Sequence, residues 1–552
     1  MQLKTNLVLA MLIGFSANAS GPVYTYWNGP ECGDWWNASN WTQGVPTGGN
    51  YVPRFSKAGY PNAGTTIAIT NAAAIDCAFI HVMDGAWSFN LRGTLSLPSE
   101  DMKNTPTVLV DKTARLTING GVLDNVAFRV STGDESQTAS LSLENCRVKD
   151  SYSVWRGGVG ESEEAAYTLN GGVYSFTTWY PRLFDRMLVR EGFVHFGSIH
   201  GLDRYGEGKG ARCDSPLEVE GGRVVVDGEG QQFMSNCCGI RAKGRGVVDI
   251  RVGGNQIWLV NSAHVRRQTW RVEDDALFVA QGPYVVGASS GVVSTGAVEV
   301  VGGRFVMKSP FANWAGTRTG CYSSLFLDGG VLDLDYSSVG TLQGTLTADD
   351  SEHLLAIGPS GGCLRNSSRN LVTVGGNGFV PASDAESDGG LTFDGQGPIS
   401  LAAASAYAGG TTVRSEVRVE ATQGAFGMGS VTVRDGGLVS VSKAETVLPE
   451  ISVFGQGTLR FSSANAAVTM PNLGFGEAGG VLVLQADTNY DKFGIERGFF
   501  SVETAPIIRA DGLCAQPVLL SVPGYGNSAR EVHLASWDAA NGRFVGATYS
   551  LG

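Results

Sequence analysis

Short stretches in which apolar and polar residues alternate run along most of this chain. Examples are 114–119 (Ala-Arg-Leu-Thr-Ile-Asn), 141–143 (Leu-Ser-Leu) and 247–252 (Val-Val-Asp-Ile-Arg-Val). A period of two places successive side chains on opposite faces, so each stretch predicts a strand with one buried face. Helical spacing is nearly absent, because the best candidate, 180–194, fits it for barely two turns. The pattern therefore predicts an all-β protein.

Doubled glycines recur between these stretches, and most are followed by residues that favour strands. Glycine adopts positive φ without steric penalty, so we expect each pair to mark a sharp turn. Further pairs stand at 389–390 and 479–480. The glycines that we expect to form structural turns are Gly120, Gly121, Gly171, Gly172, Gly221, Gly222, Gly302, Gly303, Gly329, Gly330, Gly409, Gly410, Gly436 and Gly437.

The spacing of the doubled glycines predicts a stacked repeat. The pairs that begin at residues 120, 171, 221, 302, 329, 389, 436 and 479 are 51, 50, 81, 27, 60, 47 and 43 residues apart, and several gaps lie near one or two multiples of about 25 residues. A small unit of this kind cannot bury its apolar face alone, so its copies must stack. The uneven gaps predict loops of variable length. We therefore expect a β-solenoid.

The first 19 residues have the pattern of a secretory signal peptide. Lys4 supplies a positive charge, 7–15 form a short apolar core, and 17–19 (Ala-Asn-Ala) match a cleavage site. Ser20 is then the expected first residue of the mature chain. No later stretch has eighteen uncharged apolar residues, so we expect no transmembrane helix. The expected location is outside the cell or on its outer surface.

An aromatic segment follows at 20–60. It holds Trp27, Trp35, Trp36 and Trp41 among turn residues. One interpretation is a cap that covers the first open end of the solenoid, because an uncovered end exposes a sheet edge and apolar core. The other is a ligand-binding platform, because the faces of tryptophan rings stack well on sugars.

Composition narrows the classes of partner and of cofactor. Hydrophobic residues make up 43% of the 552 residues, charged residues only 17%, and the net charge is −12. This acidity argues against nucleic acid as a partner. The nine cysteines, with a vicinal pair at 237–238, include no CxxC, and the six histidines are scattered. We expect no metal and no cofactor. Export permits disulfides, and the odd count leaves at least one thiol unpaired.

The region 389–462 has the most informative sequence pattern in the chain. It contains 406–413 (Ala-Tyr-Ala-Gly-Gly-Thr-Thr-Val), then 425–433 (Ala-Phe-Gly-Met-Gly-Ser-Val-Thr-Val), then the glycine pair at 436–437. Threonine and valine at 411–413 are β-branched and favour a strand, and threonine hydroxyls at such corners can stack in ladders.

This segment resembles the autotransporter-associated β-strand repeat, with Phe426 where that family usually has leucine. The resemblance covers about 60 residues and implies a right-handed parallel β-helix displayed at or beyond the bacterial surface. It further implies a passenger-like chain, and we expect no translocator barrel in it. The expected divisions are a signal peptide (1–19), an aromatic N-terminal cap (20–60), an irregular β-solenoid (61–388), the repeat region (389–462), and C-terminal coils with a cap (463–552).

Candidate catalytic groups are sparse. Acidic clusters stand at 161–164, 273–275 and 349–350, and each is local to one loop or strand end, whereas hydrolysis needs carboxylates that converge. The most charged central segment, 264–275, is either an anion-binding or catalytic patch, or a strand with its charges turned outward. We assign no catalytic residue.

The expected function is a secreted or surface-displayed, adhesin-like structural protein without enzymatic activity. Its expected partners are glycans or components of the extracellular matrix or cell surface. Two alternatives remain: a β-helix polysaccharide lyase or glycoside hydrolase, and a glycan-binding protein that uses the four tryptophans.

Overall fold

The computed structural model is built from strands, almost all of them parallel. Among the described residues there is no α-helix, and the one helical element is a 3-10 turn, η1 (Ala38–Asn40). The chain divides into two compact units, with the change between residues 203 and 227, inside the expected segment 61–388. The structure describes residues 21–57, 66–69, 75, 77–97, 107–131, 139–153, 167–179, 186–200, 217–227, 234–235, 239–251, 257–259, 268–281, 284–286, 294–308, 321–337, 344–348, 353–382, 389–443, 446–461 and short strands beyond 467. The segment expected to be a signal peptide, 1–19, lies outside them.

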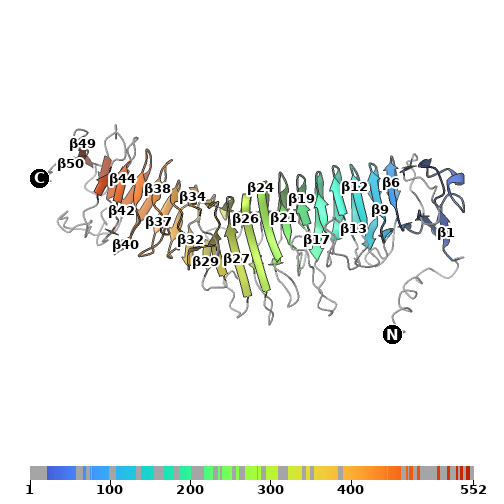
Figure 1. Cartoon of the computed structure of the whole chain (residues 1–552), viewed down its shortest axis with the longest axis horizontal. Coiled ribbons are helices and arrows are strands. Elements are labelled where there is room, and N and C mark those ends of the chain that lie inside the picture. The colour runs from blue at the N-terminus through green and yellow to red at the C-terminus, as the bar shows by residue number, and fades with distance from the viewer. Residues whose placement is uncertain are drawn as a thin grey trace. The chain divides into compact units, whose positions relative to one another are not determined.

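The strands of unit 1 lie side by side (Figure 1), and their pairing forms three parallel ladders. The first joins β1 (Val23–Tyr26), β3 (Tyr51–Phe55), β5 (Ile80–Val82), β8 (Val108–Asp111) and β11 (Ala127–Ser131). The second joins β2 (Cys32–Asp34), β4 (Thr66–Ile69), β6 (Ala86–Leu91), β9 (Arg115–Asn119), β12 (Ser140–Glu144), β14 (Tyr167–Asn170) and β16 (Met187–Val189). The third joins β7 (Thr94–Ser96), β10 (Val122–Asp124), β13 (Arg147–Ser153), β15 (Val173–Trp179), β17 (Phe193–His200) and β19 (Arg223–Val226).

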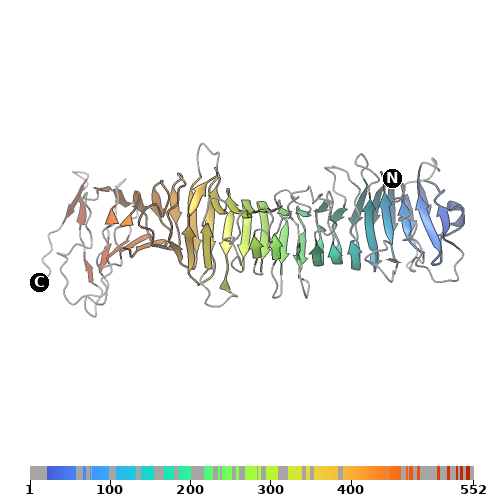
Figure 2. The ribbon, with the colours of Figure 1, turned by 90° about the horizontal axis from the view of Figure 1, so that it is seen from below.

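Unit 2 has two long ladders of its own, and its strands also lie side by side (Figure 2). The first has two branches that share the long strands β24 (Gln268–Ala280) and β26 (Ser294–Met307). One branch adds β21 (Ile240–Ala242), β27 (Cys321–Leu327), β30 (His353–Ile357) and β33 (Phe379–Pro381). The other adds β22 (Val247–Ile250), β28 (Val331–Leu334), β31 (Gly362–Asn366), β34 (Leu391–Gly395), β36 (Thr411–Val413), β38 (Val431–Val433), β41 (Ile451–Val453), β44 (Asn472–Phe475) and β46 (Ile507–Arg509).

The second contains β29 (Gly344–Ala348), β32 (Val372–Gly376), β35 (Ile399–Leu401), β37 (Glu416–Val419), β39 (Leu438–Val441), β42 (Thr458–Phe461), β45 (Val481–Leu484) and β47 (Leu519–Val522). Other described strands are β18 (Leu217–Val219), β20 (Met234–Ser235), the parallel pairs β23 (Ile257–Leu259) with β25 (Tyr284–Val286) and β40 (Thr446–Val447) with β43 (Val468–Thr469), and the antiparallel β48 (Arg530–Val532), β49 (Ala535–Asp538) and β50 (Arg543–Gly546).

The chain returns to the same ladder at short, variable intervals. We call the sequence separation between paired residues on neighbouring strands the return. Leu116 pairs with Leu141, which pairs with Tyr167, so the return in this part of unit 1 matches the interval that the glycine spacing predicted. In 389–462 the return is shorter, since Thr411 pairs with Val431 and Val431 with Ile451. The predicted interval is therefore right for parts of unit 1 and too long for the repeat region.

Alternating strands bury one side, as the sequence pattern predicted. In β12 the side chains of Leu141 and Leu143 are buried between half-buried polar neighbours. Because pairing is in register, like residues stack: the rings of Phe278 and Phe305 lie 4.9 Å apart and nearly parallel. Each fully buried side chain of this size contributes about 1.5–3 kcal/mol relative to exposure.

The doubled glycines mark corners, but for two different reasons. Positive φ occurs at Gly120, Gly121, Gly171, Gly172, Gly302, Gly303, Gly329 and Gly436. Gly222, Gly330, Gly409, Gly410 and Gly437 lack it, so positive φ explains glycine at only some of these positions. At Gly330 the reason is contact, because a Cβ would lie 2.1 Å from the carbonyl oxygen of Gly302 in the adjacent corner. Glycine there lets one corner rest directly on another.

The Tyr-x-Gly-Gly-Thr-Thr segment has a local explanation. Tyr407 is fully buried, and its hydroxyl lies 2.5 Å from that of Thr411. The Thr411 hydroxyl also donates to the carbonyl of Phe426 at 3.1 Å, while the amide of Met428 donates to the carbonyl of Tyr407. A Cβ at Gly427 would lie 2.4 Å from that carbonyl oxygen. These bonds satisfy the buried polar groups of the corner.

Candidate functional site

The four N-terminal tryptophans do not form an open platform. The side chains of Trp27 and Trp35 are fully buried and that of Trp41 is 5% exposed. Trp41 lies edge-on to both, with ring centroids 5.2 and 4.9 Å away, and its indole N–H donates to the carbonyl of Trp35. Only Trp36 is half-buried. The rings of Trp27, Trp35 and Trp41 are covered by other side chains, so these three rings have no free face to stack on a sugar.

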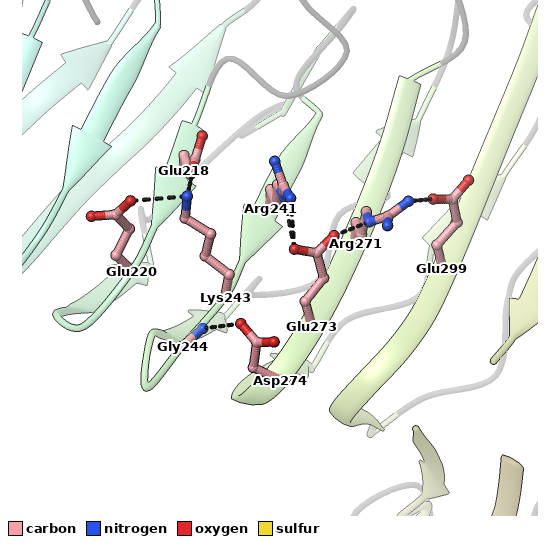
Figure 3. A network of polar contacts seen from close by, with 9 residues as sticks. All are labelled: Glu218, Glu220, Arg241, Lys243, Gly244, Arg271, Glu273, Asp274 and Glu299. Atoms are coloured by element: carbon pink, nitrogen blue, oxygen red, sulfur yellow. Dashed lines mark hydrogen bonds and ion pairs between the residues drawn. The ribbon is translucent and has the colours of Figure 1, made fainter. Parts of the chain in front are cut away.

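The charged segment 264–275 contributes to a ladder of ion pairs (Figure 3). The described part of the segment lies in β24, where Arg271 contacts Glu273 and also Glu299 of β26, the latter at 2.8 Å. Arg241 of β21 donates to the same Glu273 carboxylate at 2.7 and 3.0 Å. Glu273 is therefore held between two guanidinium groups, one from its own strand and one from β21. His264 and its neighbours through 267 lie outside the described residues.

A second group of charges extends this ladder. Lys243 contacts Glu218, which is 2% exposed, and Glu220, at 2.9 Å. Burial by itself would lower the pKa of Lys243, but the hydrogen bonds to the two glutamates outweigh that and raise it. Lys243 is therefore positively charged at neutral pH. The almost completely buried Glu218 carboxylate is stable because the ammonium compensates its lost hydration.

Asp274 has a structural position. Its φ is +53°, and it pairs in register with Gly302, so it occupies a glycine-type corner. Its carboxylate accepts the amide N–H of Gly244 at 3.0 Å. An aspartate tolerates this backbone region better than most residues because its side chain binds nearby backbone.

These contacts leave little for catalysis in this segment. The Glu273 carboxylate is bound to arginines and that of Asp274 to a backbone amide, so neither is presented as a free acid or base. Within the described ranges, no three His, Cys, Asp or Glu side chains are grouped to hold a metal ion. The clusters at 161–164 and 349–350, and the cysteines 237–238, lie outside those ranges.

The first ladder of unit 2 carries a row of hydroxyl side chains, which the sequence predicted at the corner around Thr411 and Thr412 but not over its full length. Thr392, Thr412, Thr432 and Ser452 pair in register on β34, β36, β38 and β41, and all four are half-buried between core positions. Their hydroxyls form a column, here called the hydroxyl column, with one group per strand at a spacing of about 4.8 Å. The signal in the sequence was the constant separation between successive members.

A hollow lies beside the end of this column. It has a volume of about 470 Å³ and is lined by Thr432, Arg434, Asp435, Phe454, Gly455 and Gln456; we call it the Phe454 hollow. Phe454 is 40% exposed, and Arg434 is also exposed. The Asp435 carboxylate lies 3.6 Å from Nε of Arg434 and 3.3 Å from Nε of Arg414. Carboxylate and guanidinium groups here remain open to solvent.

The environments of two described cysteines disfavour the thiolate form, which is the reactive one. Burial raises the pKa of Cys146 to about 12 and that of Cys363 to about 12, so neither is a thiolate at neutral pH. Among the described cysteines Cys32 is exposed. The described residues also include no helix with the length and apolar character needed to cross a bilayer.

Comparison with known proteins adds no relative: no family model, curated protein or solved structure matches the chain.

Proposed function

We propose that the chain is an exported right-handed parallel β-helix, related to the autotransporter-associated repeat proteins, that acts as an adhesin-like structural element at the outer cell surface without catalytic turnover. The parallel ladders, and the short return that separates their successive strands in sequence, support stacked coils. The buried tryptophans support the cap interpretation of 20–60.

One observation supports the proposal that the protein has no enzymatic activity. Two of the three carboxylates at 273–275 are engaged by groups from a neighbouring part of the chain, since Glu273 binds Arg241 and Asp274 binds the amide of Gly244 (Figure 3). Such pairs hold adjacent coils in register, and continuous ladders with few free ends resist proteolysis. These properties suit a protein that projects from a cell.

Export and turnover test this proposal together. The full chain and a variant without residues 1–19 are expressed in a bacterial host, and the fractions are analysed by mass spectrometry. We expect an exported form that begins at Ser20, resists protease and has a far-UV circular dichroism spectrum of β type. Cytoplasmic retention of the full chain would refute export. Release of reducing ends or unsaturated uronates from a glycan panel would refute the non-enzymatic role.

A further inference from the structure

We infer that the Phe454 hollow and the hydroxyl column together bind an anionic saccharide, the ligand of the adhesin-like surface; this inference rests on the proposed function. The hollow combines an exposed aromatic ring with a guanidinium, a carboxylate, an amide and a hydroxyl. Small-molecule sites typically join apolar surface to a few placed polar groups of this kind. A sugar ring has the matching chemistry, with an apolar C–H face and hydroxyls at its rim.

Phe454 supplies the apolar face. It occupies the position next to the core residue Val453, and its amide donates to the carbonyl of Val433 on the neighbouring strand. Arg434 and Arg414 occupy the equivalent positions directly after β38 and β36, because their amides donate to the carbonyls of Val413 and Phe393 in the same way. The ring and the two guanidinium groups therefore follow one another along the ladder, parallel to the hydroxyl column.

Charge selects an anionic saccharide over a neutral one. Along this row Arg365, Asp394, Arg414, Arg434 and Asp435 place three positive charges against two negative ones. Asp435 contacts each of its two arginines through Nε. Within the described residues, the terminal amino groups of Arg414 and Arg434 therefore remain available to a ligand. A guanidinium group binds a carboxylate or sulfate in a bidentate manner.

The hydroxyl column extends the surface beyond one sugar. Threonine and serine hydroxyls both donate and accept hydrogen bonds, as sugar hydroxyls do. A column with one hydroxyl per strand offers a linear ligand repeated contacts along Thr392, Thr412, Thr432 and Ser452. The site therefore suits an oligosaccharide that lies along the ladder with an acidic unit at the Phe454 hollow.

The test is a titration of the mature chain, residues 20–552, by isothermal calorimetry. The probes are an oligogalacturonate, a sulfated oligodextran, a neutral oligodextran and a single-stranded DNA oligomer. We expect the uronate or the sulfated probe to bind, with affinity that falls as salt rises. Which of the two binds identifies the acidic group. Neutral oligodextran binding equally well would overturn the charge argument, and DNA binding equally well would reduce the surface to a general polyanion site.

Matched variants locate the site. We expect Phe454→Ala and Arg434→Gln each to raise Kd roughly tenfold. The controls are Phe193→Ala, which removes a ring of similar exposure in unit 1, and Arg418→Gln, which removes an exposed arginine paired with Glu416 on the other ladder. Circular dichroism and thermal unfolding check that all four fold. Unchanged binding by the first two overturns the inference, as does silence with every probe, while export and the absence of turnover would still support the proposed function.

Discussion

Replacement of Gly330 by alanine tests whether corners of the ladder rest directly on one another. The new Cβ would lie 2.1 Å from the carbonyl oxygen of Gly302 and 2.5 Å from Cγ1 of Val300. Since ordinary contacts begin near 3.4 Å, the backbone must move by more than 1 Å. Forcing an extra methyl into a packed site costs about 1–3 kcal/mol. Loss of the bond from the amide of Cys363 to the carbonyl of Gly330 adds about 1 kcal/mol.

Gly436 provides the matched control. Its φ is +83°, but a Cβ there would meet nothing within 4 Å, so alanine suffers only backbone strain of about 1–2 kcal/mol. Reduced freedom of the unfolded chain offsets part of that. Asparagine tolerates this backbone region, so Gly436→Asn should be nearly neutral, whereas Gly330→Asn should be as damaging as alanine. The two glycines should therefore respond differently to the same pair of substitutions.

Hydrogen exchange measures these effects locally, which matters because long stacked chains need not unfold in one step. A destabilisation of about 3 kcal/mol at Gly330 should speed exchange in peptides over 331–337 by roughly 100-fold, since about 1.4 kcal/mol is a factor of ten. Gly436→Ala should speed exchange over 438–443 by roughly fivefold. Equal protection in Gly330→Ala and the native chain would show that the corners are not in contact, and the packing argument would fail.

Three further results are expected. Trp35→Ala should lower stability by about 3–5 kcal/mol, measured by thermal unfolding, while oligosaccharide binding stays unchanged; an unchanged melting temperature would contradict its burial. Burial would raise the pKa of Asp335, but hydrogen bonds from Lys308 and Ser337 outweigh that and lower it. Asp335→Asn should therefore be less stable than the native chain at pH 7, with the difference disappearing as pH falls below about 4 through the folded pKa; a constant difference would contradict this. A thiol reagent at pH 8 should label Cys32 within minutes and leave Cys146 unmodified until denaturation, as read by peptide mass mapping; equal labelling would show that Cys146 is accessible.

The elements that sequence predicted well are those fixed by local pattern. Alternation identified strands such as β12, because inward positions must be apolar wherever the chain pairs. Doubled glycines identified corners for a similar reason. At Gly330 and Gly409 glycine is needed for a second reason, because these corners touch the corner stacked beside them. The residues of that neighbouring corner are distant in sequence, so the local sequence does not show the contact. For the same reason the sequence could not decide whether the four tryptophans form a cap or a ligand-binding platform, since the burial of their rings depends on which segments pack over them.

The Phe454 hollow was missed because its chemistry is spread over the repeat. Arg434 and Phe454 are separated by one full return of the chain, and neither stands in a charged or aromatic cluster of the sequence. Only the register of β38 with β41 brings them together. A comparison of positions separated by that constant return would have aligned arginine, arginine and phenylalanine, and beside them the four hydroxyl residues.

The two branches of the first ladder in unit 2 use their outward-facing positions in different ways, and this difference supports a binding site at the Phe454 hollow. On β21, β24 and β26 the charges of Arg241, Glu273, Arg271 and Glu299 meet opposite charges on the next strand, so these side chains stabilise register. On β34 to β41 the shorter return places small hydroxyls and exposed side chains outward, with arginine in excess. In both branches the inward-facing apolar side chains form the core that stabilises the fold. The packing of that core therefore does not require an aromatic side chain at the solvent-facing position of Phe454. An exposed aromatic ring beside two guanidinium groups that share one carboxylate offers both apolar contact and spare hydrogen-bond donors to a single anionic ligand.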